Sequence, residues 1–277
     1  MNAGQPFFKL EALGNDFVLL DHRQGQADPA PEKIRALADR HTGIGFDQLL
    51  IVKPATSHVA DVRVDIFNQD GSPARQCGNG MRAVARWLED EQPDRHAFAL
   101  STPAGLVSTE NLGEQGIRVE MGTPEFGPHA TGLTGNIGIG EVIGDIPGLI
   151  RFGLVSMGNP HLILQLDRVP DAGIVQHHGA RIGQHQAFRE GINVSFAHLN
   201  EDKVIDLRVH ERGVGPTRAC GSAACATGAF MIQAGQSDSP VNVDQPGGRL
   251  VINWRGERDP LWMTGPAQRV FNGIFLS

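Results

Sequence analysis

The sequence predicts an α+β protein made of two similar halves, each with a mainly antiparallel sheet and a central helix. Three observations lead to this fold class. A set of short motifs recurs about 143 residues further along, a strand-like alternation precedes each copy, and an apolar helical stretch follows it. A repeat of about half the 277-residue length indicates two duplicated domains, because solenoid repeats are far shorter.

The clearest repeat is a pattern of proline, arginine, cysteine and glycine at equal offsets, which covers 73–78 and again 216–221. Weaker marks keep the same order and nearly the same shift: Asn15 recurs as Asn159, and Gln48 loosely as Asn193. Several polar marks with one common shift favour duplication over chance.

The segments around each cysteine repeat as well. Residues 62–67 alternate apolar and polar, which predicts a half-buried strand, and 81–88 carry apolar residues at helical spacing. The second half has a strand pattern over 204–209 and an alanine-rich helical pattern from Cys220 to Gln233. We therefore expect each cysteine on a loop that leads into the N-terminus of a helix.

The remaining elements are short. Residues 31–40 predict an amphipathic helix, with Pro31 in its first turn and Gly43 beyond its end. Further strands are predicted at 7–10, 17–21, 48–53, 97–101, 105–109, 117–121, 161–166 and 250–254. The glycine-rich stretch 132–148 predicts a loop or hairpin.

Composition and charge narrow the class of protein. With 40% hydrophobic and 20% charged residues the chain is typical of a globular protein. A net charge of −7 argues against a nucleic-acid or anionic-membrane partner. The sequence shows neither a signal peptide nor an apolar run long enough for a membrane span. Three widely spaced cysteines predict a reducing compartment, the cytoplasm.

Paired cysteines at helix starts suggest proton transfer. Unpaired N–H groups and the helix dipole lower the pKa of a thiol there, and the same N–H groups can hold a carboxylate. Thiols on opposite faces of one carbon can remove a proton from one side and return it to the other. A single cysteine is more often inert and buried; the duplication of Cys77 as Cys220 favours catalysis.

The other candidate motifs do not predict a catalytic, metal-binding or cofactor-binding site. Cys225 lies five residues beyond Cys220 and is predicted to pack in the core. The spacing of Cys220 and Cys225 with scattered histidines, among them His177, His178 and His185, is not that of a metal site. Residues 138–144 have the wrong glycine spacing for a dinucleotide loop. We therefore predict no metal and no organic cofactor.

The polar marks of the repeat fit a zwitterionic small molecule. Asn15, Gln48, Asn68, Asn159 and Asn193 offer uncharged donors and acceptors, although each alone could equally cap a turn. Glu211 and Arg212 break the symmetry with one charge of each sign, and Arg suits a carboxylate while Glu suits an ammonium.

At these residues the chain resembles the diaminopimelate epimerase family, from Phe8 to Phe275. The matching stretches are Leu13–Phe17, Gly43–Gln48, Phe67–Ser72, Cys77–Arg82, Met157–His161, Ile192–Phe196, Glu211–Gly215, Ala219–Ser222 and Gly265–Ala267. The resemblance implies a cofactor-independent interconversion of LL- and meso-diaminopimelate for lysine and peptidoglycan synthesis. It also implies two pseudo-symmetric halves, 1–121 and 122–265, with 266–277 packing on the first half and the active site in the cleft between them.

Carried onto this chain, the resemblance assigns the site residues. Cys77 and Cys220 would be the acid and base. The substrate would be bound by Asn15, Gln48, Asn68, Gly78, Asn79, Asn159, Asn193, Glu211, Arg212, Gly221 and Ser222. His161 and Glu211 would tune the cysteine pKa values. The family is commonly homodimeric, and Phe271 stands where a tyrosine is common and would take part in dimer contacts.

The chain differs from the family pattern at two further positions, and the sequence leaves two alternative functions open. Ala223 stands where the family usually has glycine, and Arg189 where a proline is frequent. One alternative is a related cofactor-independent isomerase, either a racemase for another amino acid or a phenazine-type isomerase. The other is a non-catalytic amino-acid-binding protein on the same fold, which would have no need of two cysteines.

Overall fold

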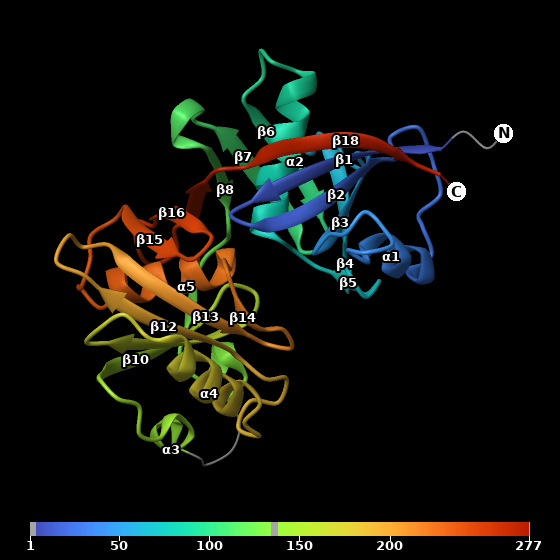
Figure 1. Cartoon of the computed structure of the whole chain (residues 1–277). Coiled ribbons are helices and arrows are strands. Elements are labelled where there is room, and N and C mark those ends of the chain that lie inside the picture. The colour runs from blue at the N-terminus through green and yellow to red at the C-terminus, as the bar shows by residue number, and fades with distance from the viewer. Residues whose placement is uncertain (1–3, 134–137, 277) are drawn as a thin grey trace. The chain divides into compact units, whose positions relative to one another are not determined.

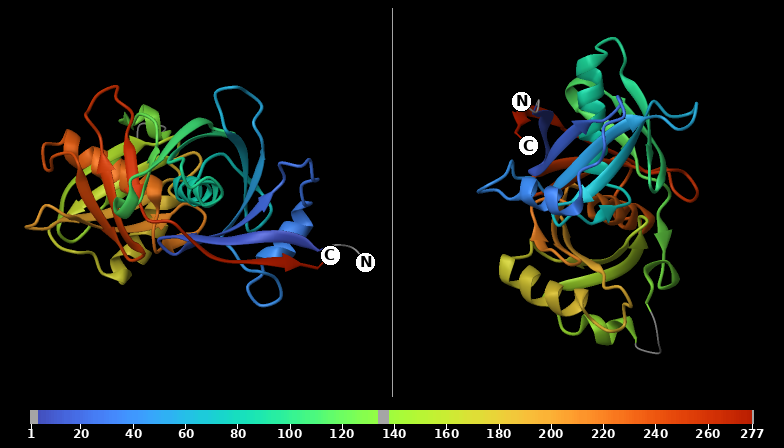
Figure 2. Two further views of the ribbon diagram at one scale, coloured as in Figure 1. Left: turned by 90° about the horizontal axis from the view of Figure 1, so that it is seen from above. Right: turned by 90° about the vertical axis from the view of Figure 1, so that its right-hand side faces the viewer.

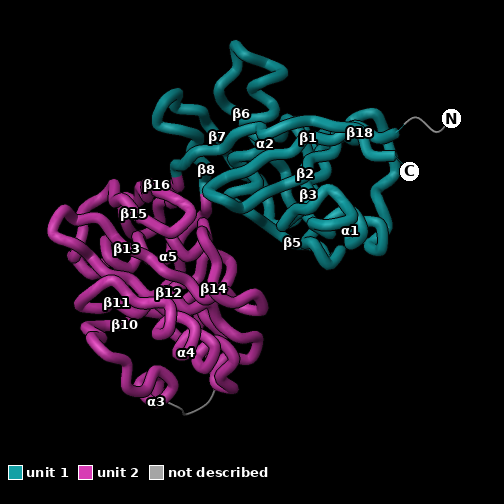
Figure 3. The backbone as a smooth tube through the Cα atoms, in the orientation of Figure 1, with its two compact units in different colours: residues 1–120, 264–277 teal, residues 121–263 magenta. Residues whose placement is uncertain are grey.

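The computed structural model describes residues 4–133 and 138–276 (Figure 1). The chain forms two compact units, the first made of 1–120 and 264–277 and the second of 121–263 (Figure 3). The assignment of the two halves as separate domains remains a prediction. No helix among the described residues has the length and apolar character needed to cross a membrane.

The first unit is a curved sheet around one helix. Its strands, in order of pairing, are β18 (Gln268–Phe275), β1 (Gln5–Ala12), β2 (Asn15–Asp21), β3 (Gln48–Pro54), β4 (Val62–Asn68), β6 (Ala97–Thr102), β7 (Gly105–Asn111) and β8 (Ile117–Glu120). Neighbours run antiparallel except β2–β3 and β4–β6, and the short β5 (Pro73–Ala74) pairs with β4. A single-turn 3-10 helix, η1 (Gly113–Gln115), joins β7 to β8.

The helix α2 (Gly78–Glu91) lies inside this sheet. It packs against β1, β2, β3, β6, β7, β8 and β18, and Figure 2 shows it end-on with strands curving around it. Met81, Val84 and Leu88 on α2 are buried. The outer helix α1 (Pro31–Ala38) covers a second apolar cluster through Ile34 and Leu37.

The second unit repeats the plan. Its strands, in order of pairing, are β9 (Glu125–Phe126), β10 (Leu149–Ser156), β11 (Pro160–Leu166), β12 (Asn193–Leu199), β13 (Ile205–Glu211), β15 (Val241–Gln245) and β16 (Gly248–Asn253). The short β14 (Gly215–Thr217) pairs with β13. The strand β17 (Trp262–Gly265) follows β16 in the chain, and its last two residues, Thr264 and Gly265, already belong to the first unit. The helix α5 (Gly221–Gln233) packs against β10–β13, β15 and β16, while α4 (Ala172–Gly183) lies on β12 and β13.

The strand registers match between the units. In the parallel pairs, Phe17 faces Gln48 where His161 faces Asn193. In the next parallel pairs, Val62 faces Leu100 where Ile205 faces Val243. Corresponding positions lie 143–145 residues apart, the shift found in the cysteine motifs. The predicted α+β fold with a duplicated sheet-and-helix plan is confirmed.

Several local predictions need correction. The stretch 132–148 was expected to be a loop or hairpin, but its described part contains the helix α3 (Ile139–Ile143). The 3-10 helix η2 (His129–Thr131) ends just before this stretch. Val142 and Ile143 are buried in an apolar cluster, and that burial favours the helix despite the glycines; residues 134–137 of this prediction lie outside the described part. The strand β12 was missed because both of its faces are buried, so no alternation marks it. The first predicted helix ends at Ala38 rather than 40.

Candidate active site

Both repeated cysteines are the N-cap residues of the central helices. Cys77 precedes α2 and Cys220 precedes α5, each with extended backbone dihedral angles. The Gly80 N–H donates to Cys77 Sγ at 3.3 Å. The predicted position of each cysteine, on a loop that leads into a helix, is confirmed. Gly78 and Gly221 are the first residues of these helices.

Amide side chains surround Cys77 in the first unit. Asn15 Oδ1 lies 3.9 Å from Cys77 Sγ and accepts a hydrogen bond from Asn79 Nδ2 at 3.4 Å. Arg82, which is completely buried, donates from Nη2 to Asn79 Oδ1 at 2.9 Å. Asn15 in turn donates from Nδ2 to Asp47 Oδ2 at 2.9 Å. The predicted residue Asn15 therefore contacts both the cysteine and Asn79, which is also a predicted residue.

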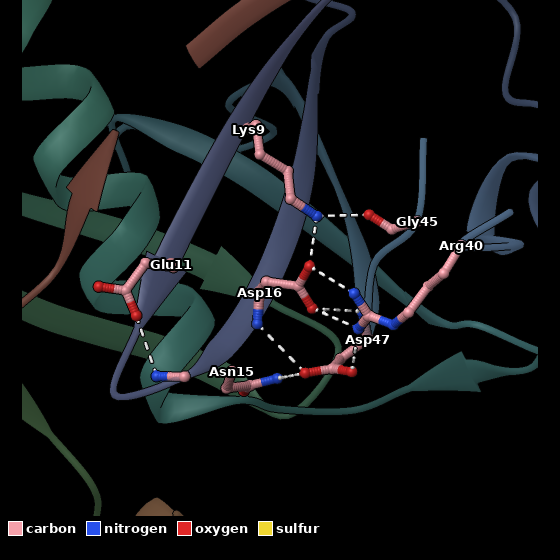
Figure 4. Close-up of polar contacts among 8 residues, drawn as sticks. Lys9, Glu11, Asn15, Asp16, Arg40, Gly45 and Asp47 are labelled. Carbon is pink, nitrogen blue, oxygen red and sulfur yellow. Dashed lines mark hydrogen bonds and ion pairs between the residues drawn. The ribbon is translucent and has the colours of Figure 1, made fainter. Parts of the chain in front are cut away.

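A charged cluster supports Asn15 from the other side (Figure 4). Asp16 on β2 lies beside Asp47, which directly precedes β3, and Arg40 donates to both carboxylates at 2.7–3.0 Å. Lys9 also contacts the Asp16 carboxylate. Burial alone would raise the pKa of Asp16, but hydrogen bonds from Arg40 and Lys9 and their charges lower it to about 2. Asp16 is therefore ionised at neutral pH.

Gln48 and Asn68 face each other on β3 and β4. Gln48 Nε2 donates to Asn68 Oδ1 at 3.0 Å, and Asn68 Nδ2 donates to Ser72 Oγ at 3.0 Å. Gln48 Oε1 is buried and has no hydrogen-bond partner among the described residues. That oxygen can accept a further donor, which suits a residue predicted to bind substrate.

A different set of groups surrounds Cys220. Ser222 Oγ lies 3.5 Å from Cys220 Sγ and accepts from Asn159 Nδ2 at 3.2 Å. Asn159 Oδ1 lies 3.0 Å from His161 Nε2. Burial and, secondarily, the Arg212 charge lower the pKa of His161 to about 3, so this imidazole is neutral. Its Nε2 must carry the proton that Asn159 Oδ1 accepts, and Nδ1 has no partner among the described residues.

The electrostatics at Cys220 differ from the prediction made for a helix N-terminus. Complete burial raises the pKa of the Cys220 thiol well above its ordinary value, and the Glu211 charge raises it further. The Ser222 hydroxyl and the Ala223 N–H lower it. The predicted net lowering is wrong for Cys220, because the cost of burying a thiolate exceeds what the helix start returns.

Asn193, Glu211 and Arg212 meet where β12 begins and β13 ends. Asn193 Oδ1 accepts from the Arg212 backbone N–H at 2.9 Å, and its Nδ2 donates to Pro160 O at 3.1 Å. Glu211 Oε1 accepts a hydrogen bond from Thr217 Oγ1. The Arg212 guanidinium donates to Glu190 O at 3.1 Å and lies 3.5 Å from the exposed Glu190 carboxylate. The Arg212 side chain is 37% exposed.

The predicted residues therefore form local groups in each unit, while Phe271 lies on β18. Its ring contacts the Phe7 ring at 6.0 Å between centroids. Residues that the prediction missed are Asp47, Asp16 and Arg82. Each lies inside a quoted motif, and Arg82 is one helical turn from Asn79, a spacing that predicts contact.

Two hollows in the described part of the structure lie away from the predicted site residues, and the described residues form no metal-binding cluster. A hollow of about 390 Å³ in the second unit is lined by Phe126 and Trp254, and another of about 330 Å³ by Asp202 and Asn242. Neither includes a predicted site residue. Within 4–133 and 138–276, no group of three or more histidines, cysteines or carboxylates is placed to hold a metal ion.

Comparison with known proteins identifies the family. A model of the family described as diaminopimelate epimerase matches residues 7–127 and 153–270. A diaminopimelate epimerase of Xanthomonas axonopodis pv. citri is 43% identical over 96% of this chain and 95% of its own length. One from Alkalilimnicola ehrlichii is 41% identical over 96% of this chain and 97% of its own length.

Solved structures of lower identity share the fold. A phenazine biosynthesis protein of the PhzF family from Bacillus anthracis has a TM-score of 0.69 at 18% identity, over 99% of both chains. A probable proline racemase from Agrobacterium radiobacter K84 has a TM-score of 0.70 at 16% identity, over 98% of this chain and 93% of its own. The family match and the near-complete relatives together show that the chain belongs to the diaminopimelate epimerase family, whose members are isomerases acting on amino acids.

Proposed function

We propose that this protein interconverts LL- and meso-diaminopimelate by two-base proton transfer, with Cys77 and Cys220 acting on one α-carbon. The observation that carries the proposal is the placement of both cysteines as N-caps of corresponding helices in a duplicated fold. The reaction would use no metal and no organic cofactor. It would supply lysine and peptidoglycan precursors in the cytoplasm.

The helix starts suit the developing charge. When the α-proton leaves, negative charge spreads onto the substrate carboxylate, where preorganised N–H donors stabilise it. The first turns of α2 and α5 offer such N–H groups at Gly78, Asn79, Gly221 and Ser222. Asn79 and Ser222 add side-chain donors beside their cysteines.

Each cysteine has neighbours suited to both protonation states. The Cys77 thiol can donate to Asn15 Oδ1, and its thiolate can accept from the Gly80 N–H. The Ser222 hydroxyl can either donate to Cys220 or accept from it. A group that is alternately acid and base needs a partner in each state.

The raised pKa of Cys220 supports one assignment of the acid and the base, in which Cys220 would start as the acid and Cys77 as the base. Burial keeps Cys220 as a thiol at neutral pH, so it delivers a proton while Cys77 removes one. The reverse reaction needs the Cys220 thiolate, which Ser222 and the Ala223 N–H stabilise. His161 supports Ser222 through Asn159, and Glu211 raises the Cys220 pKa by its charge.

The rest of the substrate would be held by amides and one charged pair. Asn15, Gln48, Asn68, Asn159 and Asn193 supply donors and acceptors. Arg212 would bind the distal carboxylate and Glu211 the ammonium, so that these two residues select a substrate with amino-acid groups at both ends.

The test is incubation with LL-diaminopimelate in D2O, following deuterium at the α-carbon by mass spectrometry and the meso product by chiral chromatography. We expect one deuterium per turnover from the wild-type protein and none from a Cys77→Ala/Cys220→Ala variant. Full incorporation by that double variant would overturn the two-base assignment. Racemisation of other amino acids, but not of diaminopimelate, would overturn the assignment of diaminopimelate as the substrate.

The assembly proposed is a homodimer through β18. Val270, Phe271 and Ile274 on this strand are apolar side chains that are 47–65% exposed, and a second copy would cover Phe271. Light scattering after size exclusion should give twice the chain mass for the wild type and the single-chain mass for Phe271→Glu. A dimeric Phe271→Glu variant would remove Phe271 from the interface.

A further inference from the structure

Four polar side chains of the first unit form a hydrogen-bond chain with one direction. Arg82 donates to Asn79, Asn79 donates to Asn15, and Asn15 donates to Asp47. The chain begins at a guanidinium, which can only donate, and ends at a carboxylate, which when ionised can only accept. The two ends therefore determine which way both amides between them point.

The reverse orientation of Asn15 is unfavourable on both sides. It would place Oδ1 against the Asp47 carboxylate and Nδ2 against the NH2 group of Asn79, so two repulsive contacts would replace two hydrogen bonds. We propose that Asp47 is a positioning residue of the site, which holds the Asn15 carboxamide with Oδ1 toward Cys77. The proposal deepens the function proposed for Cys77 and rests on it.

Asp47 is itself firmly held. Its two carboxylate oxygens receive three donors: Asn15 Nδ2, the Asp16 N–H at 3.2 Å and Arg40 Nη2 at 2.8 Å (Figure 4). The Asp47 N–H donates back to Asp16 Oδ1 at 3.1 Å. A carboxylate with this many fixed donors cannot rotate away from Asn15 without losing several bonds at once.

In the second unit, the neighbouring groups orient the corresponding asparagine carboxamide in the opposite way. Asn159 corresponds to Asn15, yet its Oδ1 faces His161 and its Nδ2 faces Ser222, next to Cys220. The corresponding asparagines thus turn opposite ends toward their cysteines. The orienting group is a carboxylate for Asn15 and a neutral imidazole donor for Asn159.

The test exchanges the amide and the acid. Asn15→Asp alone would place two carboxylates together, and we expect its melting temperature to fall by about 4 °C or more. In Asn15→Asp/Asp47→Asn the new amide at position 47 can turn its NH2 toward the new carboxylate at position 15, at the cost of the hydrogen bond from the Asp16 N–H, so we expect part of that loss to be recovered. The control is Asn15→Asp/Asp65→Asn, because Asp65, like Asp47, is a carboxylate paired with an arginine, but it contacts neither Asn15 nor Cys77.

A second readout separates positioning from stability. The pH profile of iodoacetamide alkylation, resolved by peptide mass spectrometry, reports the thiolate fraction of each cysteine. In the swapped variant a charged acceptor faces Cys77, so its profile should move up by about one pH unit while that of Cys220 is unchanged. Recovery no greater than in the control, or an unmoved Cys77 profile, would overturn the proposal. Neither readout requires turnover, so a wild-type protein without epimerase activity would refute the proposed function alone.

Discussion

The two units share a backbone plan but differ in what surrounds their cysteines. The strand registers correspond residue by residue, and both cysteines cap the central helix. In the first unit an ion-pair cluster of Lys9, Asp16, Arg40 and Asp47 lies beyond Asn15. In the second unit, Pro160 and Ile192 occupy the positions of the two aspartates. The group that orients the corresponding asparagine there is a buried neutral histidine, His161. Duplication preserved the geometry, whereas the polarity of each half diverged.

The largest effect expected separates the two cysteines. Cys77→Ala and Cys220→Ala should each slow epimerisation by at least about 100-fold, because each removes one acid/base group. The remaining thiolate can still remove a proton and return a deuteron on its own face. We expect the two variants to exchange the α-hydrogen of opposite epimers in D2O without inverting it. Exchange of the same epimer by both variants would contradict the assignment of one cysteine to each face.

The next effect tests the second unit's orienting group. His161→Phe places the aromatic ring of the corresponding Phe17 at this buried position and leaves the partly buried Asn159 Oδ1 without its donor. The free energy of unfolding should fall by about 1–3 kcal/mol, measured by urea denaturation. His177→Phe, at an exposed position on α4, is the control and should change it little. Equal stability of both variants would mean that the His161 hydrogen bond contributes nothing.

A packing difference between the central helices gives a similar or smaller effect. Gly228 in α5 corresponds to Ala85 in α2, and a Cβ at Gly228 would lie 2.9 Å from Ile252 Cγ2. Gly228→Ala should therefore destabilise by about 1–2 kcal/mol, despite the better helix propensity of alanine. Ala85→Gly should destabilise by about 1 kcal/mol for the opposite reason. Stabilisation by Gly228→Ala would show that the two helices have the same space around them.

The smallest effect concerns acid stability of the first unit. The folded pKa of Asp16 is about 2, below its ordinary value of 3.8, so Asp16 contributes stability above pH 4 that is lost as the pH falls toward 2. Asp16→Asn should flatten that part of the pH–stability curve by no more than about 1 kcal/mol. Thermal melts at pH 2–6 give the comparison, and an unchanged slope would mean that the ion pairs add nothing.

The sequence predicted the structure best where a motif occurs twice, because the two copies can be aligned with each other. The shift between Cys77 and Cys220 predicted corresponding helix starts, and alternation predicted β4 and β13. Prediction from the sequence failed where burial in the folded structure determines the local conformation or the pKa. The segment 139–143 forms a helix because Val142 finds an apolar cluster, and the Cys220 pKa rises because the thiol is enclosed. Asp47 was overlooked because its importance depends on which end of Asn15 it holds, a three-dimensional property.

The pairing of β1 with β18 has a consequence for biosynthesis. In Figure 1 the two strands run side by side, with Gln5 opposite Phe275 and Glu11 opposite Gln268. The ribosome therefore makes β1 before the whole second unit and β18 after it. The sheet of the first unit is begun before the second unit is made and completed after it, so during synthesis one edge of β1 stays unpaired until β18 emerges. Chaperone contacts on the nascent chain should concentrate there.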